Sequence, residues 1–154
     1  MENLLQLLDT KGRVSDATGA KALALKGGEV SFSGVSFGYE PSRTVLKEVS
    51  FHAPPSSTVA FVGATGSGKS TLTRLLFRFF DVTSGSITVD GQDIRAVTQA
   101  SLRAAIGMVP QDCVLFNDTI RYNIRYGRPG SSDAEVEAAA KAACIHDAIS
   151  RFPK

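Results

Sequence analysis

Residues 63–70 constrain the fold of this 154-residue chain more than any other feature. They read Gly-Ala-Thr-Gly-Ser-Gly-Lys-Ser and match the whole pattern G-x-x-x-x-G-K-[ST] of a phosphate-binding loop. An apolar, β-branched run at 58–62 precedes the loop and predicts a buried strand. After the loop, four apolar residues recur at the spacing of one helix face: Leu72, Leu75, Leu76 and Phe79. A strand, a glycine loop and a helix in this order are the context that the motif requires.

The residue types of the loop explain what it can bind. Glycines let the backbone approach an anion closely, and the loop amides and the start of the following helix supply favourable partial charge. Lys69 is expected to reach the β- and γ-phosphates of a nucleotide, and the Ser70 hydroxyl to ligate Mg²⁺. The alternative is a chance glycine-rich turn, but every fixed position and both flanks match. The candidate nucleotide-binding residues are therefore Gly63, Ala64, Thr65, Gly66, Ser67, Gly68, Lys69, Ser70 and Thr71.

Composition excludes several other classes of protein. The chain is 43% hydrophobic and 21% charged, as is ordinary for a globular domain, and its formal net charge is +2. No basic run suggests a nucleic-acid partner. No stretch approaches the roughly 18–20 apolar residues that a membrane-spanning helix needs. Any membrane association must therefore come from polypeptide outside these residues.

The remaining pattern predicts an α/β domain behind a linker. Residues 1–9 look like the end of an amphipathic helix, and residues 10–28 lack a sustained period. Residues 1–28 are predicted to be a linker, and the domain is predicted to occupy 29–154. Strands are expected around 30–37, with a bulge at Gly34, at 45–51, at 86–89 and at 106–109, with an Asp90-Gly91 turn after the third. Helices are expected at 98–105, 118–126 and 132–143, the last opened by a capping box from Ser132 to Glu135.

Two further residues stand at strand ends. An aromatic ring at Tyr39 could stack on an adenine, although a strand-end tyrosine more often only covers the core. Gln111 could ligate Mg²⁺ through its carbonyl oxygen or orient a water, although most such glutamines are simply solvated. Neither residue identifies a site by itself.

Taken together, Tyr39, the loop at 63–70 and Gln111 resemble the A-loop, Walker A and Q-loop of the nucleotide-binding domain of ATP-binding-cassette (ABC) transporters. The segments 46–51, 84–91 and 116–120 also look like that family. The amino-acid sequences at 75–80 and 123–127 are similar to those of exporter-type half-transporters, especially the mitochondrial and heavy-metal-tolerance branch. The resemblance covers essentially the whole chain. It implies a P-loop NTPase fold with N-terminal antiparallel strands and part of the helical subdomain, truncated at its C-terminal side.

The resemblance also implies roles and partners. Tyr39 would stack on adenine, the loop would hold the phosphates of ATP, and Ser70 and Gln111 would coordinate Mg²⁺. Gln111 would report the nucleotide state to a transmembrane domain, in the same or a neighbouring chain, that precedes Met1. A second nucleotide-binding domain would complete a head-to-tail dimer. The domain would then be membrane-associated through that transmembrane domain and lie on the cytosolic or matrix side.

Parts of a working cassette are missing from these residues. There is no Leu-Ser-Gly-Gly-Gln signature and no Walker B aspartate followed by glutamate, and neither His52 nor His146 follows the right element to be the switch histidine. Asp90 ends an apolar strand, but Gly91 follows it, so a turn explains it better. Hydrolysis needs a positioned base and firm Mg²⁺ coordination, so we expect this chain to bind ATP and to be inactive as an ATPase alone.

The sequence therefore leaves three hypotheses about the function of this chain. The first is the N-terminal part of an exporter's nucleotide-binding domain, which couples ATP binding and hydrolysis to transport in a longer protein. The second is a non-hydrolysing nucleotide-binding module with a regulatory role. The third is a soluble cassette protein without a transport function, which the exporter-like text at 116–127 disfavours.

Overall fold

The computed structural model describes residues 14–112 and 114–152. The chain forms two compact units, Met1–Gly107 and Met108–Lys154, and each is considered by itself. The first half of the predicted linker, 1–13, lies outside the described residues. The division into linker and domain at residue 28 remains a prediction.

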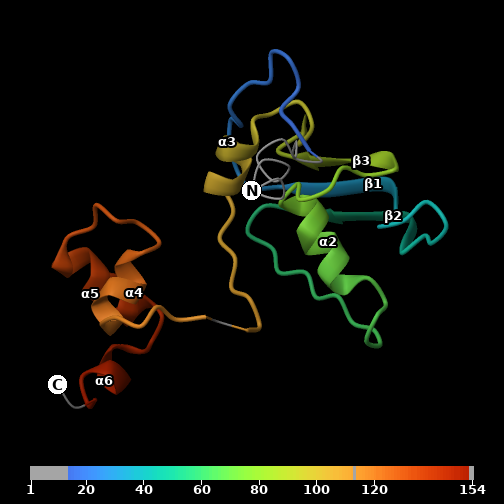
Figure 1. Ribbon diagram of the computed structural model, residues 1–154. Helices are drawn as coiled ribbons and strands as arrows, with labels where there is room; N and C mark the ends of the chain where they lie inside the picture. The colour runs from blue at the N-terminus through green and yellow to red at the C-terminus, as the bar shows by residue number, and fades with distance from the viewer. Residues whose placement is uncertain (1–13, 113, 153–154) are drawn as a thin grey trace, which may run out of the picture. The chain divides into compact units, whose positions relative to one another are not determined.

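A four-stranded antiparallel sheet forms the centre of the first unit (Figure 1). Its strands are β1 (Val30–Phe37), β2 (Leu46–Ala53), β3 (Ser84–Val89) and β4 (Gln92–Asp93), in the spatial order β2-β1-β3-β4. The pairing register shifts between Phe32 and Val35, on either side of Gly34, whose φ is 56°. The predicted hairpin-like front with a bulge at Gly34 is therefore confirmed.

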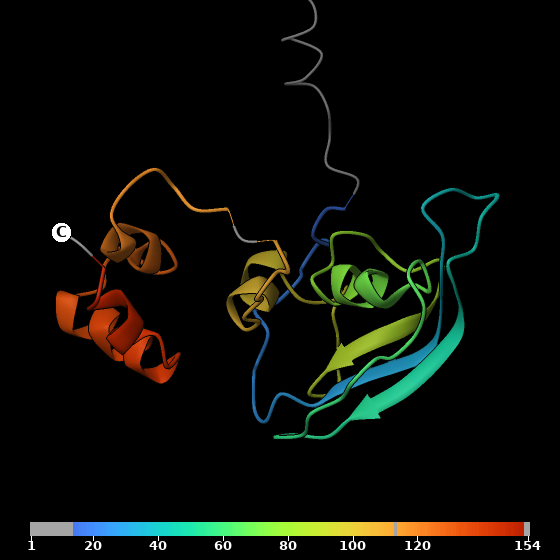
Figure 2. The ribbon, with the colours of Figure 1, turned by 90° about the horizontal axis from the view of Figure 1, so that it is seen from below.

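One helix, α2 (Lys69–Leu76), packs against a face of this sheet (Figure 2). Leu75 is fully buried and Leu72 nearly so, in one cluster with strand residues such as Phe32, Val35 and Leu46. The predicted helix face extended to Phe79, and this was wrong. The helix ends at Leu76, Arg78 takes a left-handed φ of 51°, and the ring of Phe79 is exposed.

Two predicted strands are absent from the described sheet. Residues 58–62, before the phosphate loop, have no strand partner, and Val62 is 96% exposed. Residues 106–109 follow α3 (Gln99–Ala104) and are irregular as well, with Val109 95% exposed. An apolar run can show strand propensity, but a strand forms only when another segment completes its hydrogen-bond ladder, and no described segment does so here.

The second unit is helical. It contains α4 (Ile120–Arg125), α5 (Asp133–Ala142) and a short α6 (His146–Ile149) that the sequence analysis did not predict. The capping box is confirmed, because Ser132 accepts from the Glu135 amide while the Glu135 side chain accepts from the Ser132 amide. Arg121 and Arg125 on α4 form ion pairs with Asp133 at the start of α5. These pairs tie α4 to α5.

Residues 14–29, here called the strap, have almost no regular secondary structure, yet they are fastened to the first unit along their length. Lys21 exchanges backbone hydrogen bonds with Ala96 and Thr98, and the Leu23 amide donates to the Ser101 hydroxyl. Near its start, the Asp16 carboxylate accepts from both nitrogens of Gln99. The strap is therefore part of the packed unit.

Buried Arg78 connects the start of the strap to the end of α2. Only 3% of its side chain is exposed. Its guanidinium donates to the Val97 and Ser15 carbonyls and to the Asp81 carboxylate, and Asp16 lies 3.7 Å away. A buried arginine needs such a complete set of acceptors, so Arg78 specifies where the strap begins to pack.

Asp90 holds the other end of the strap. Asp90 and Gly91 both have positive φ, 48° and 74°, as a two-residue turn between β3 and β4 requires. One carboxylate oxygen of Asp90 accepts from the amides of Lys26, Gly27 and Gly28, and the other accepts from Glu29. Asp90 is thus a structural turn residue, as the sequence analysis argued.

These hydrogen bonds from backbone amides favour the ionised carboxylate and lower the pKa of Asp90 to about 2 from an ordinary value of 3.8. Because the folded pKa is depressed, the stabilisation is fully present above the ordinary pKa and is lost as the pH falls through about 2.

We predict that Asp90→Asn, which retains the turn preference, lowers the stability of the fold at pH 7 and flattens the pH dependence of that stability between about pH 4 and pH 2. Urea unfolding across this range, with Asp112→Asn as control, measures the effect. An unchanged pH profile in Asp90→Asn would contradict the strap contact.

Candidate functional site

The phosphate loop lies at the N-terminus of α2, as the sequence predicted. The N-cap residue is Gly68, with φ 93°, and a glycine has no side chain that could cap the helix. No acidic residue occurs in the first turn of α2. Within the described chain, the first amides of α2 are therefore left to backbone groups, solvent or a ligand. An uncapped helix N-terminus at the end of a glycine loop favours an anion through its amides and its partial positive charge.

The glycines of the loop differ in what a side chain would meet. A Cβ on Gly68 would lie 2.7 Å from Cδ2 of Leu46, which belongs to the core. A Cβ on Gly63 would lie 2.8 Å from the Ser67 hydroxyl oxygen across the loop. At Gly66, by contrast, φ is 84° but the space around a Cβ is open. Gly68 thus allows the loop to pack closely against Leu46 of β2. Gly66 allows only the local backbone conformation.

The Lys69 ammonium group folds back over the loop. Its Nζ donates to the Gly63 carbonyl at 2.7 Å and to the Ala64 carbonyl at 2.8 Å, and lies 3.5 Å from the Ser67 hydroxyl. Neutral carbonyls are weaker partners for an ammonium than phosphate oxygens are. The structure therefore holds a cation at the loop that is available to a phosphate group.

The two hydroxyl residues that follow Lys69 have different surroundings. Ser70 is exposed, whereas Thr71 is only 5% exposed. Thr71 Oγ1 lies 3.2 Å from the hydroxyl of Tyr39. The structure thus brings Tyr39 to the first turn of α2, close to the loop, which sequence spacing could not establish.

Tyr39 lies after β1, and its ring packs against two phenylalanine rings that also contact each other. The rings of Phe37 and Phe80 stand nearly perpendicular to it, with centroids 5.0 Å and 5.2 Å away. Arg74 donates to its hydroxyl at 3.0 Å. Burial raises the pKa of the Tyr39 phenol, but the hydrogen bonds with Thr71 and Arg74, together with the charge of Arg74, outweigh it and lower the pKa. Arg74 is a contact that the sequence analysis missed.

Gln111 belongs to the second unit, in an exposed irregular segment near its start. Its role at a metal ion therefore remains a prediction. In the described ranges 14–112 and 114–152, no three His, Cys, Asp or Glu side chains gather as a metal cluster would, and no helix has the length and apolar character to cross a membrane.

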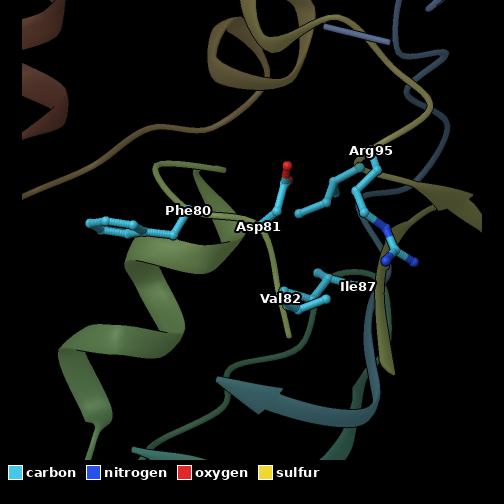
Figure 3. Close-up of a pocket in the computed structure, with 6 residues that line it drawn as sticks. Phe80, Asp81, Val82, Ile87 and Arg95 are labelled. Atoms are coloured by element: carbon cyan, nitrogen blue, oxygen red, sulfur yellow. The ribbon is translucent and has the colours of Figure 1, made fainter. Parts of the chain in front are cut away.

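A depression elsewhere on the first unit is not a competing site. It lies beside the end of α2 and is lined by Phe80, Asp81, Val82, Ile87, Ile94 and Arg95 (Figure 3). It has no room for even a water molecule. This depression therefore cannot hold a ligand.

The glycine loop at the start of a helix that packs on a sheet is the arrangement of a P-loop nucleotide-binding domain. Comparison with known proteins agrees. The family model described as "ABC transporter" matches residues 46–154. This chain belongs to the ABC transporter family.

The relatives extend along the whole chain. ATP-binding cassette sub-family B member 6 of Mesocricetus auratus is 56% identical over 100% of this chain and 18% of its own length. The ATM1-type heavy metal exporter of Novosphingobium aromaticivorans is 54% identical over 100% of this chain and 25% of its own length. A solved structure, of a bacterial Atm1-family ABC exporter with ATP bound, matches with a TM-score of 0.94 and 55% identity over 99% of this chain and 27% of that chain. The chain thus spans about a quarter or less of the length of these relatives.

The different surroundings of Gly68 and Gly66 generate a prediction. An alanine in the left-handed region costs about 1–2 kcal/mol, so Gly66→Ala should destabilise the chain by about that amount. Gly68→Ala should cost more, because its Cβ would also meet Leu46. Urea unfolding of the two variants measures the difference. An equal decrease in the free energy of unfolding of both variants would contradict the close packing of the loop against β2.

Proposed function

We propose that this chain binds ATP through residues 63–71, as the nucleotide-binding part of an ABC exporter. The observation that carries the proposal is the loop geometry at α2: an uncapped helix N-terminus, Gly68 at φ 93° against Leu46, and the Lys69 ammonium over the loop. The shape of the loop, the partial charge of the helix N-terminus and the nearby ammonium group all suit a polyphosphate. A relative with a TM-score of 0.94 was solved with ATP bound, which supports ATP as the nucleotide.

The individual residues have distinct proposed roles. Lys69 exchanges its two carbonyl partners for phosphate oxygens, while the loop amides from Gly63 to Ser70 orient the phosphates. The partly exposed ring of Tyr39, whose side chain is held near Thr71, stacks on the adenine ring. Ser70 and Gln111 hold Mg²⁺, which when bound offsets the charge of the phosphates. The exposed hydroxyl at the start of α2 fits a hard, oxygen-preferring cation.

We further propose how the chain acts in a longer protein. Two of these relatives are named as exporters. This chain spans 18–27% of the relatives, so transport would require polypeptide beyond these residues. The partners would be a transmembrane domain in the same or a neighbouring chain and a second nucleotide-binding domain arranged head to tail. The strap would then connect that transmembrane domain to the nucleotide-binding domain, which would lie on the cytosolic or matrix side of the membrane.

Nucleotide binding tests the central proposal. Lys69→Ala should weaken Mg-ATP binding at least tenfold, because it removes a cation from a phosphate site. Lys47→Ala removes the same charge from the exposed side of β2 and should leave binding unchanged. Isothermal titration or a fluorescent ATP analogue gives the dissociation constants. Equal affinity in the Lys69 variant and the native chain would refute the phosphate site.

Hydrolysis distinguishes the exporter hypothesis from a self-sufficient ATPase. These residues contain no Walker B pair, signature or switch histidine, so the set of groups that hydrolysis needs is incomplete. We predict that the purified chain binds Mg-ATP with negligible phosphate release. Robust turnover that Lys69→Ala abolishes would show that the chain contains a complete catalytic site.

A further inference from the structure

Two side chains of α2, Thr71 and Arg74, converge on one hydroxyl group, that of Tyr39. Arg74 Nη1 donates to the phenolic oxygen at 3.0 Å, and Thr71 Oγ1 lies 3.2 Å from the same oxygen. Thr71 and Arg74 are three residues apart on α2, so they project from one face of the helix. Since the phenolic oxygen accepts from Arg74, its own hydrogen can be donated to Thr71. The hydroxyl is thus held from both sides.

The backbone around Tyr39 does not fix the ring by itself. Tyr39 follows the end of β1, outside any ladder of paired strands, and 39% of its surface is exposed. The rings of Phe37 and Phe80 pack nearly perpendicular to the Tyr39 ring and restrict it. The Arg74 guanidinium lies 6.0 Å from the ring centroid, so its contact is with the hydroxyl end of the side chain. Arg74 therefore supplies a charged anchor at the one end of the ring that the aromatic contacts leave free.

Such an anchor matters for recognition of a planar base. Ordering a free side chain on binding lowers affinity, and a side chain that is already ordered avoids this loss. A charge-assisted hydrogen bond is stronger than a neutral one and is suited to this task. Arg74 has no ion-pair partner among the described residues, so its charge is not committed elsewhere in the first unit.

We propose that Arg74 is a positioning residue for nucleotide recognition: it holds the Tyr39 hydroxyl so that the ring is already in place for the base, without itself contacting the phosphates. This inference rests on the proposed binding of ATP by the loop. It predicts that Arg74 contributes to the binding of a nucleotide and contributes nothing to the binding of a bare polyphosphate. A purely structural arginine, or one that contacts phosphate, would affect both ligands alike.

The test compares Mg-ATP with Mg-tripolyphosphate, which has the phosphates but no base, on the full chain. Arg74→Gln should weaken Mg-ATP binding about three- to tenfold and leave Mg-tripolyphosphate binding unchanged. Arg74→Lys keeps a charged donor and should restore part of the affinity. Arg43→Gln, which removes an exposed arginine from the neighbouring turn, is the matched control and should bind both ligands normally. Equal loss for both ligands, or no loss for Mg-ATP, would overturn the proposal.

Two further measurements separate positioning from folding. Tyr39→Phe keeps the ring and removes the anchored oxygen, so its effect on Mg-ATP binding and that of Arg74→Gln should not add in the double variant. Ultraviolet titration of the phenol should show a higher pKa for Tyr39 in Arg74→Gln, with Tyr39→Phe assigning the signal among the three tyrosines. Additive effects on binding would refute an action through Tyr39.

The outcome also separates this inference from the function on which it rests. If Lys69→Ala leaves Mg-ATP and Mg-tripolyphosphate binding intact, the phosphate site itself is wrong. If Lys69→Ala weakens both ligands while Arg74→Gln weakens neither, the phosphate site holds and only the role of Arg74 fails.

Discussion

Burial of one face of α2 against the sheet is the interaction on which the rest of the first unit depends. Leu75 is completely buried, and Leu72 packs beside it on the strands. This packing holds the helix N-terminus, and with it the phosphate loop, at a defined place on β2, where Gly68 rests against Leu46. Removal of apolar surface from water thus positions a loop that has few contacts of its own. The same helix carries Thr71 and Arg74 to the hydroxyl of Tyr39.

Polar contacts then attach the strap to this core. Arg78, at the end of α2, holds the start of the strap, and Asp90, in the turn after β3, holds its end through four amides. Both residues have positive φ. Residues other than glycine rarely adopt this conformation, so the surrounding structure must hold each of them in its turn. A segment without regular structure is in this way joined to the elements that carry the phosphate loop.

Much of the fold and of the loop could be predicted from local patterns. The motif at 63–70, the bulge at Gly34 and the capping box at Ser132 are each specified by residues close together in the sequence. The errors occurred where a distant partner decides the outcome. Residues 58–62 have the composition of a strand, but no described segment pairs with them. The helix face was extended to Phe79 because Arg78 gives no sequence signal that it turns inward to carbonyl and carboxylate groups.

The sequence by itself determined the family, the chemistry of the loop and the identity of the side chains that can serve a nucleotide, because glycines, a lysine and a serine at fixed spacing have little other use. Only the tertiary structure decided which of these side chains meet. It brings Tyr39 to Thr71 and adds Arg74, because the packing of α2 on the sheet sets a distance that no spacing in the sequence contains.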